Sequence, residues 1–337
     1  MEPTSTTLAR TAQQSDSPAP RSVRRPRHDR DPQAGTAPHW YTAHPALGSG
    51  DARAAERLLR STAPTPATCP ALQHAARVLL HTGNPRRSAT WCAKLHPHAP
   101  TPAWATAFLA LRAEALLHLG DLAAAAHEAA EAQRTAGHRP TALRLWPTAV
   151  RAEALIALGR HEEAAAHLAP PAPEPSWSLA PWLRARGRLH LAAHRDRDAF
   201  DAFDAFRTTG RLALGHGAGG LPHLPWRSDM AEALLRRGRT DQARALLTEE
   251  LGLPAAGPRH RGIALRLLGA TDETGRRPGT LARAIGELRR CDDRVALART
   301  MTDLAHALDT LDDASAPGFL RRATDLAADC GLPSAAP

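Results

Sequence analysis

Apolar residues recur at helical spacing along most of the chain. A clear example lies between two proline-rich breaks, where apolar positions three or four residues apart form one stripe: Trp104, Phe108, Leu111, Ala115 and Leu119. Leu109 and Leu116 begin a second stripe beside it. Two adjoining stripes are typical of a helix that packs between two neighbours.

Proline and glycine divide the chain from about residue 46 onward into segments of helical length. The breaks lie near residues 64–66, 83–85, 97–102, 137–140, 170–175, 215–225, 254–258 and 275–279. Trp146, Trp182 and Trp226 each adjoin a proline and are expected to open a helix. No segment shows the alternation of a β-strand, so the pattern predicts an all-α protein.

A short motif recurs at a wide and regular spacing. Arg-Ala-Glu-Ala-Leu occurs at 112–116 and again at 151–155, and Ala-Glu-Ala-Leu occurs at 231–234. Each copy is followed by a glycine (Gly120, Gly159, Gly238) and, five residues later, by an alanine (Ala125, Ala164, Ala243). We expect the glycine to end a helix in the left-handed conformation. The alanine should lie where two helices approach closely.

The spacing of these copies predicts an α-α superhelix. The three glutamates of the motif lie 39 and then 79 residues apart, so the period is near 40 residues. Residues 157–164 resemble the turn inside a tetratricopeptide repeat. We therefore predict a tetratricopeptide-like solenoid of about seven degenerate helix pairs over residues 46–332. Residues 1–45 are expected to form a disordered basic N-terminal tail, and residues 333–337 a short C-terminal tail.

Composition agrees with this fold class and leaves a second function open. Alanine dominates, and isoleucine, tyrosine and phenylalanine are scarce, which favours helices over strands. The net charge is +9, with a local run of arginines at 21–30. The simpler interpretation is that these positive charges lie on a solvated surface and in a solvated tail. The alternative is a protein that contacts DNA or RNA non-specifically through its arginine-rich surface and tail.

The cysteines and the apolar runs indicate a cytoplasmic protein. The four cysteines lie 23, 199 and 39 residues apart, without a CxxC pair or zinc-like spacing, and are expected to be buried thiols. The first residues lack the pattern of a signal peptide. The uninterrupted apolar runs are only about five residues long, so no membrane partner is expected.

The sequence has no catalytic or cofactor-binding motif in the context that its chemistry requires. Residues 215–220 fit GxGxxG, but helical residues precede them where a dinucleotide site needs a strand. The sequence contains no GxxxxGK[ST] phosphate loop, no HExxH pair and no GxSxG elbow. Adjacent glutamates such as Glu162 and Glu163 point about 100° apart on a helix and cannot act as one acid–base pair. We therefore predict no catalytic, cofactor-binding or metal-binding residue, and a protein that is not an enzyme.

The C-terminal half resembles a family of regulators. Residues 225–251 read PWRSDMAEALLRRGRTDQARALLTEEL, and IALRLLG at 263–269, DLAHAL at 303–308 and LRRATDLAADCG at 320–331 continue the match. Residues 195–331, and more weakly residues 100–194, resemble the helical-repeat region of large ATP-binding LuxR-type transcriptional regulators of actinobacteria. The nucleotide-binding and helix-turn-helix domains of that family have no counterpart here. The resemblance implies a sensor or scaffold region.

These observations predict a non-enzymatic module that binds a protein or peptide partner, or senses an effector, in the concave groove of the superhelix. The candidate groove-lining residues come from the repeated motif: Arg112, Glu114, Arg151, Glu153 and Glu232. A second interpretation of the same residues is that they form structural salt bridges within each repeat. The sequence leaves both open.

Overall fold

A computed structural model describes residues 51–137, 142–169, 179–215, 225–253 and 257–333. The tail predicted over 1–45, and all but the first residue of the tail predicted over 333–337, lie outside these ranges. The described ranges contain helices and no β-strand, and none of their helices is long and apolar enough to cross a membrane.

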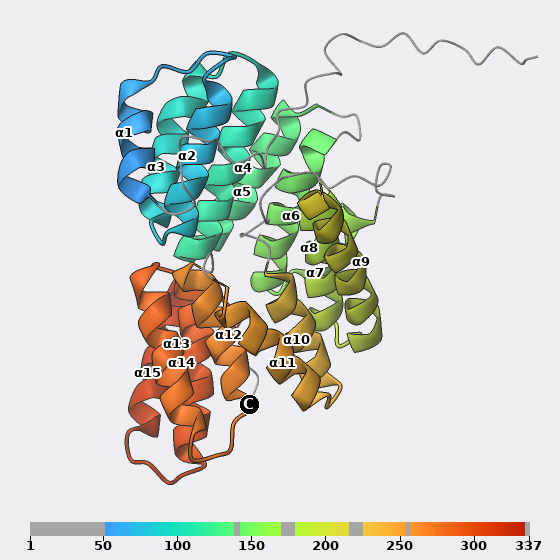
Figure 1. The fold of residues 1–337 in the computed structure, drawn as a ribbon, viewed down its shortest axis with the longest axis vertical. Helices are drawn as coiled ribbons and strands as arrows, with labels where there is room; N and C mark the ends of the chain where they lie inside the picture. The colour runs from blue at the N-terminus through green and yellow to red at the C-terminus, as the bar shows by residue number, and fades with distance from the viewer. Residues whose placement is uncertain (1–50, 138–141, 170–178, 216–224, 254–256, 334–337) are drawn as a thin grey trace, which may run out of the picture. The chain divides into compact units, whose positions relative to one another are not determined.

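The chain forms fifteen α-helices and one short 3₁₀ helix in the described ranges (Figure 1). Their bounds are α1 Ala52–Ser61, α2 Cys69–His81, α3 Pro85–Leu95, η1 His96–His98, α4 Pro102–Leu119, α5 Leu122–Thr135, α6 Ala142–Ala157, α7 His161–Leu168, α8 Ala180–Ala192, α9 Asp196–Gly215, α10 Trp226–Arg236, α11 Thr240–Leu251, α12 Pro258–Gly269, α13 Arg277–Arg290, α14 Arg294–Asp309 and α15 Ala316–Asp329.

The helices pack as a two-layer array of repeats. Each helix contacts the next one along the chain, as α13, α14 and α15 do in Figure 1. Each even-numbered helix from α2 to α12 also contacts the next even-numbered helix, so these helices form one layer, which we term the even-helix layer. The array comprises seven helix pairs, from α2/α3 to α14/α15, with α1 packed against α2. The predicted fold class is confirmed.

The structure also contains the glycine turns and the buried alanines that the repeated motif predicts. Gly120, Gly159 and Gly238 follow α4, α6 and α10 with φ angles of 80°, 75° and 70°. In this region of conformational space a side chain is strained and glycine is not. The three alanines that follow, Ala125, Ala164 and Ala243, are completely buried. Both sequence predictions are therefore confirmed.

The apolar stripes define the core. Trp104, Phe108 and Leu111 of α4 are buried, and α4 is buried over most of its circumference because helices lie on several sides of it. The four cysteines are buried and form no disulfide, as predicted. Farther along, the ring of the buried Phe203 of α9 lies so close to Gly187 of α8 that a methyl group there would overlap it.

The tryptophan prediction holds only in part. Trp226 is the first residue of α10 and Trp182 lies in the first turn of α8, as expected. Trp146 instead lies in the second turn of α6, with Pro147 inside the helix. The preceding Leu145 is buried in the core, so burial of apolar residues extends the helix toward the N-terminus past the proline.

Contacts between the two ends of the repeat array add to the sequential packing. Helix α14 contacts α4, although about five helix pairs separate them in sequence order. A methyl group on Gly83, in the turn after α2, would lie 3.1 Å from the Cβ atom of Cys291 after α13. A methyl group on Gly120, after α4, would overlap the sulfur of Cys330 after α15. We term these contacts the seam.

Further contacts lie along the same seam. The Arg86 guanidinium lies 3.0 Å from the Asp292 carboxylate, and Pro333 lies against Gly159 in the turn after α6. The rings of His81 and His260 stack with centroids 6.2 Å apart. Three successive turns of the N-terminal repeats therefore touch the ends of C-terminal helices.

Candidate functional site

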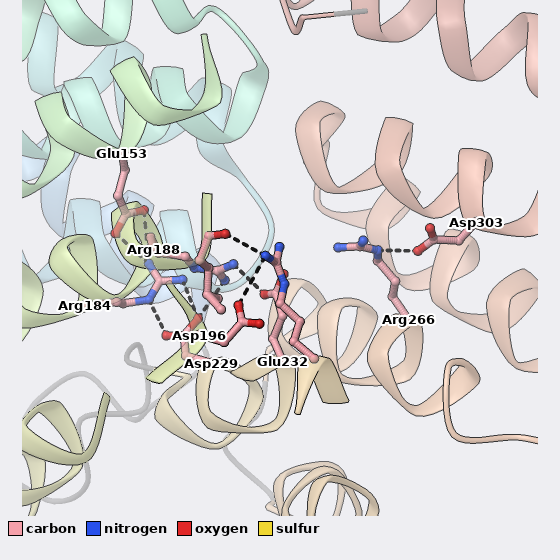
Figure 2. A network of polar contacts seen from close by, with 10 residues as sticks. Glu153, Arg184, Arg188, Asp196, Asp229, Glu232, Arg266 and Asp303 are labelled. Carbon is pink, nitrogen blue, oxygen red and sulfur yellow. Dashed lines mark hydrogen bonds and ion pairs between the residues drawn. The ribbon is translucent and has the colours of Figure 1, made fainter. Parts of the chain in front are cut away.

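Charged side chains of the even-helix layer form a connected network (Figure 2). Its centre is Arg184 of α8, which is 8% exposed. Its Nη1 donates to both oxygens of Glu153 on α6, at 2.9 and 3.1 Å, and its Nε donates to Asp229 on α10 at 2.6 Å. One arginine therefore joins three successive even-numbered helices. Burial opposes its charge, but the Asp229 and Glu153 carboxylates raise the pKa of Arg184 above its usual value.

Arg188, one turn farther along α8, extends the network. Its guanidinium lies 2.7 Å from Asp229 and donates to Glu232 at 2.7 Å. Asp229 is fully buried and is shared by Arg184 and Arg188. A carboxylate removed from water in this way is stable only because cationic donors surround it.

The same arrangement recurs between α12 and α14. Arg259 donates to Asp293 at 2.6 Å, and Arg266 donates to Asp303 at 2.6 Å. Asp293 has a second role, because its other oxygen accepts from the backbone N–H of Ala296 and caps α14. Ion pairs thus connect α6, α8 and α10, and separately α12 and α14. We term the side of the even-helix layer that carries these ion pairs, together with Glu114 of α4 beside Trp146, the polar face.

A small cavity of about 40 Å³ lies beside this network. It is lined by thirteen residues of α2, α4, α6, α8 and α12, including Glu114, His118, Trp146 and Arg184. The Trp146 indole N–H donates to Glu114 at 3.1 Å. Burial raises the pKa of Glu114, and burial together with the neighbouring charge of Arg259 holds the pKa of His118 well below its usual value. A polar cavity of this size accommodates a few water molecules.

A buried carboxylate lies behind the network, between α10 and α11. Glu250 is 4% exposed and accepts from both the backbone N–H and the hydroxyl of Ser228, at 2.8 and 2.9 Å. Burial raises the pKa of Glu250 to about 7, against the lowering effect of the Ser228 hydrogen bonds. The charge of Asp229 contributes to the rise.

The structure separates the five candidate residues into two groups. Glu114, Glu153 and Glu232 lie on the polar face, where each bonds to a side chain of an adjacent even-numbered helix. Arg112 instead forms an ion pair with Glu128 of α5 at 2.9 Å. Arg151 donates to Gln133 of α5 at 3.0 Å. The two arginines thus connect an even-numbered helix to an odd-numbered one.

The most connected residues of the network were missed in the sequence. Arg184 and Asp229 lie 45 positions apart and outside the repeated Arg-Ala-Glu-Ala-Leu motif. A weak signal exists for Arg184, because Leu183 and Ala185 flank it and a charge among apolar residues needs a partner. Within the described residues no group of three or more histidine, cysteine or acidic side chains could hold a metal ion. The chemistry available on the polar face is charge pairing and hydrogen bonding.

Comparison with known proteins supports the fold and leaves the family open. No protein-family profile matches the sequence, and no curated protein matches it. A solved structure, of a Rap protein complexed with competence and sporulation factor, is similar with a TM-score of 0.60 and 15% sequence identity. The match covers 80% of this chain and 78% of the other. At this identity the similarity establishes a shared helical-repeat fold.

Proposed function

We propose that the protein is a non-enzymatic interaction module that holds a segment of a partner protein, or a peptide, against the polar face of the even-helix layer. Helical-repeat proteins use the extended surface along their repeats for this purpose. The observation that carries the proposal is the gathering of charged side chains from successive even-numbered helices on one face (Figure 2). The similar structure, a Rap protein in complex with a factor, supports a binding role for this fold.

We also propose a place in transcriptional regulation, on the resemblance of residues 195–331 to the repeat region of LuxR-type regulators. In that role the module would sense an effector or serve as a scaffold.

The test first finds peptides that bind the protein and then asks whether a bulky substitution on the polar face prevents their binding. An immobilised array of random 12-residue peptides is probed with the full chain, and the tightest binder is titrated in solution by fluorescence anisotropy. Leu117→Trp adds bulk beside the cavity, whereas Leu320→Trp adds the same bulk on α15, where Leu320 is 42% exposed. We expect the first variant to weaken binding at least tenfold and the second to leave it within about twofold.

Circular dichroism of both variants establishes that they are folded. An array on which no peptide binds the wild-type chain would overturn the proposed function. Equal weakening by the two tryptophan variants would show that binding occurs away from the polar face.

A further inference from the structure

One carboxylate at the C-terminal side of the polar face lies within range of the charges of four arginines. The carboxylate is Glu232 of α10, and the arginines belong to α8, α10, α12 and α14: Arg188, Arg236, Arg266 and Arg299. Burial acts in the opposite direction, but these arginines together lower the pKa of Glu232 to about 2. This part of the face therefore holds more cationic donors than Glu232 alone can satisfy.

Two of the four arginines use their terminal nitrogens on acceptors of this chain. Arg188 donates to Glu232 at 2.7 Å, and Arg236 donates to a main-chain carbonyl of α8 at 2.6 Å. Arg266 bonds to Asp303 through Nε, at 2.6 Å. Its terminal nitrogens form no hydrogen bond with the described residues, and Figure 2 shows them directed toward the side where Glu232 lies. Arg266 thus retains N–H donors on the polar face.

The fourth arginine has no acceptor. Arg299 of α14 is exposed and forms no ion pair or hydrogen bond within the part of the chain that the structure describes. Arg299 lies one helical turn before Asp303 on α14, and Asp303 accepts from Arg266 of α12, so Arg299 and Arg266 lie on the same side of α14. Two guanidinium groups with unused donors therefore share one region, and their like charges disfavour each other until an anion joins them.

We propose that Arg266 and Arg299 bind a carboxylate of the partner segment, so that the segment recognised by this protein is acidic at the position that meets α12 and α14. This inference rests on the proposed function. Guanidinium groups present a planar fork of N–H donors that matches the two oxygens of a carboxylate. Among the described residues, the carboxylates near this pair are engaged: Arg188 binds Glu232, Arg266 binds Asp303 and Arg259 binds Asp293.

The test uses the tightest peptide from the 12-residue array and its analogue in which each Asp and Glu is replaced by Asn and Gln. Both peptides are titrated by fluorescence anisotropy against the wild-type chain and against Arg299→Gln. We expect the acidic peptide to bind wild type at least tenfold more tightly than the amide analogue, as a charge-assisted hydrogen bond requires. In Arg299→Gln this ratio should fall to about threefold or less.

The control is Arg283→Gln on α13, which removes the same charge from another exposed arginine. It should leave the acid-to-amide ratio within about twofold of wild type, whereas a general effect of net charge would lower the ratio in both variants equally. Because Arg299 is exposed and loses no bond to any residue that the structure describes, Arg299→Gln should fold normally, and circular dichroism verifies this.

The outcomes separate the two proposals. Peptides that bind without dependence on their acidic residues, or a ratio unchanged by Arg299→Gln, would overturn the carboxylate site and leave the binding function standing. An array with no binder would overturn the binding function and, with it, the site.

Discussion

Replacing Asp229 by alanine removes a fully buried carboxylate that two arginines share. Breaking a buried ion pair by removing one partner costs about 3–5 kcal/mol, because it leaves an uncompensated charge out of water. Here each arginine keeps a second carboxylate, Glu153 for Arg184 and Glu232 for Arg188. We therefore expect a loss at the lower end of this range, about 3 kcal/mol in the free energy of unfolding.

Urea denaturation followed by far-ultraviolet circular dichroism measures this loss, provided that the slope of the free energy against urea is unchanged. The matched control is Asp198→Ala on α9, since Asp198 is half exposed and lies 3.9 Å from Arg195. Its loss should stay within about 0.5 kcal/mol. If Asp229→Ala costs less than about 1 kcal/mol, the network does not depend on Asp229 and the reasoning fails.

Four further substitutions test the packing and the buried charge. Gly187→Ala should destabilise the protein by about 1–3 kcal/mol in urea denaturation, because the added methyl group overlaps the buried Phe203 ring. Gly286→Ala in α13 is the control, because the added methyl group would meet no neighbouring group within 4 Å, and it should stabilise the protein by about 0.5–1 kcal/mol. If both substitutions changed stability in the same direction, the close contact between Gly187 and Phe203 would be contradicted. Gly120→Ala should lower the free energy of unfolding by about 1–2 kcal/mol, because Gly120 has a positive φ angle and packs against Cys330 at the seam. An unchanged stability in the same assay would argue against the strained backbone and against the seam contact. The pKa of Glu250 is about 7 in the folded protein against 4.5 as the reference, so the folded state holds that proton more tightly and loses about 3 kcal/mol as pH rises from 4.5 to 7. Glu250→Gln should remove this loss when denaturation at about pH 5 and about pH 8 is compared, and an equal loss in the variant would refute it.

The fold could be predicted from the sequence because its signals are local and repeated. Gly120 and Ala125 show why: a left-handed turn and a tight helix contact each restrict one position, and the same restriction recurs in every copy. Trp146 shows the limit of such signals. Its neighbouring proline indicated a helix start, but burial of Leu145 extends α6 past that proline.

The candidate site could be predicted only in part. Glu153 was identified because it belongs to the repeated motif, whereas its partner Arg184 lies outside the motif. Which side chain meets Glu153 depends on the angle and offset between α6 and α8, and no spacing along the chain encodes either. Arg112 shows the converse, since its motif position was visible but its direction, toward Glu128 of α5, was not.

The seam has a consequence for how the protein can change in evolution. A repeat array whose ends are free can gain or lose a helix pair, because each repeat contacts only its neighbours. Here Gly120 and Cys330 fit one another with no room for a methyl group, so inserting or deleting a pair between them would misalign that fit. Duplication within residues 121–329 should therefore be poorly tolerated, and the length of this array is set by the requirement that its last helix meet its second pair.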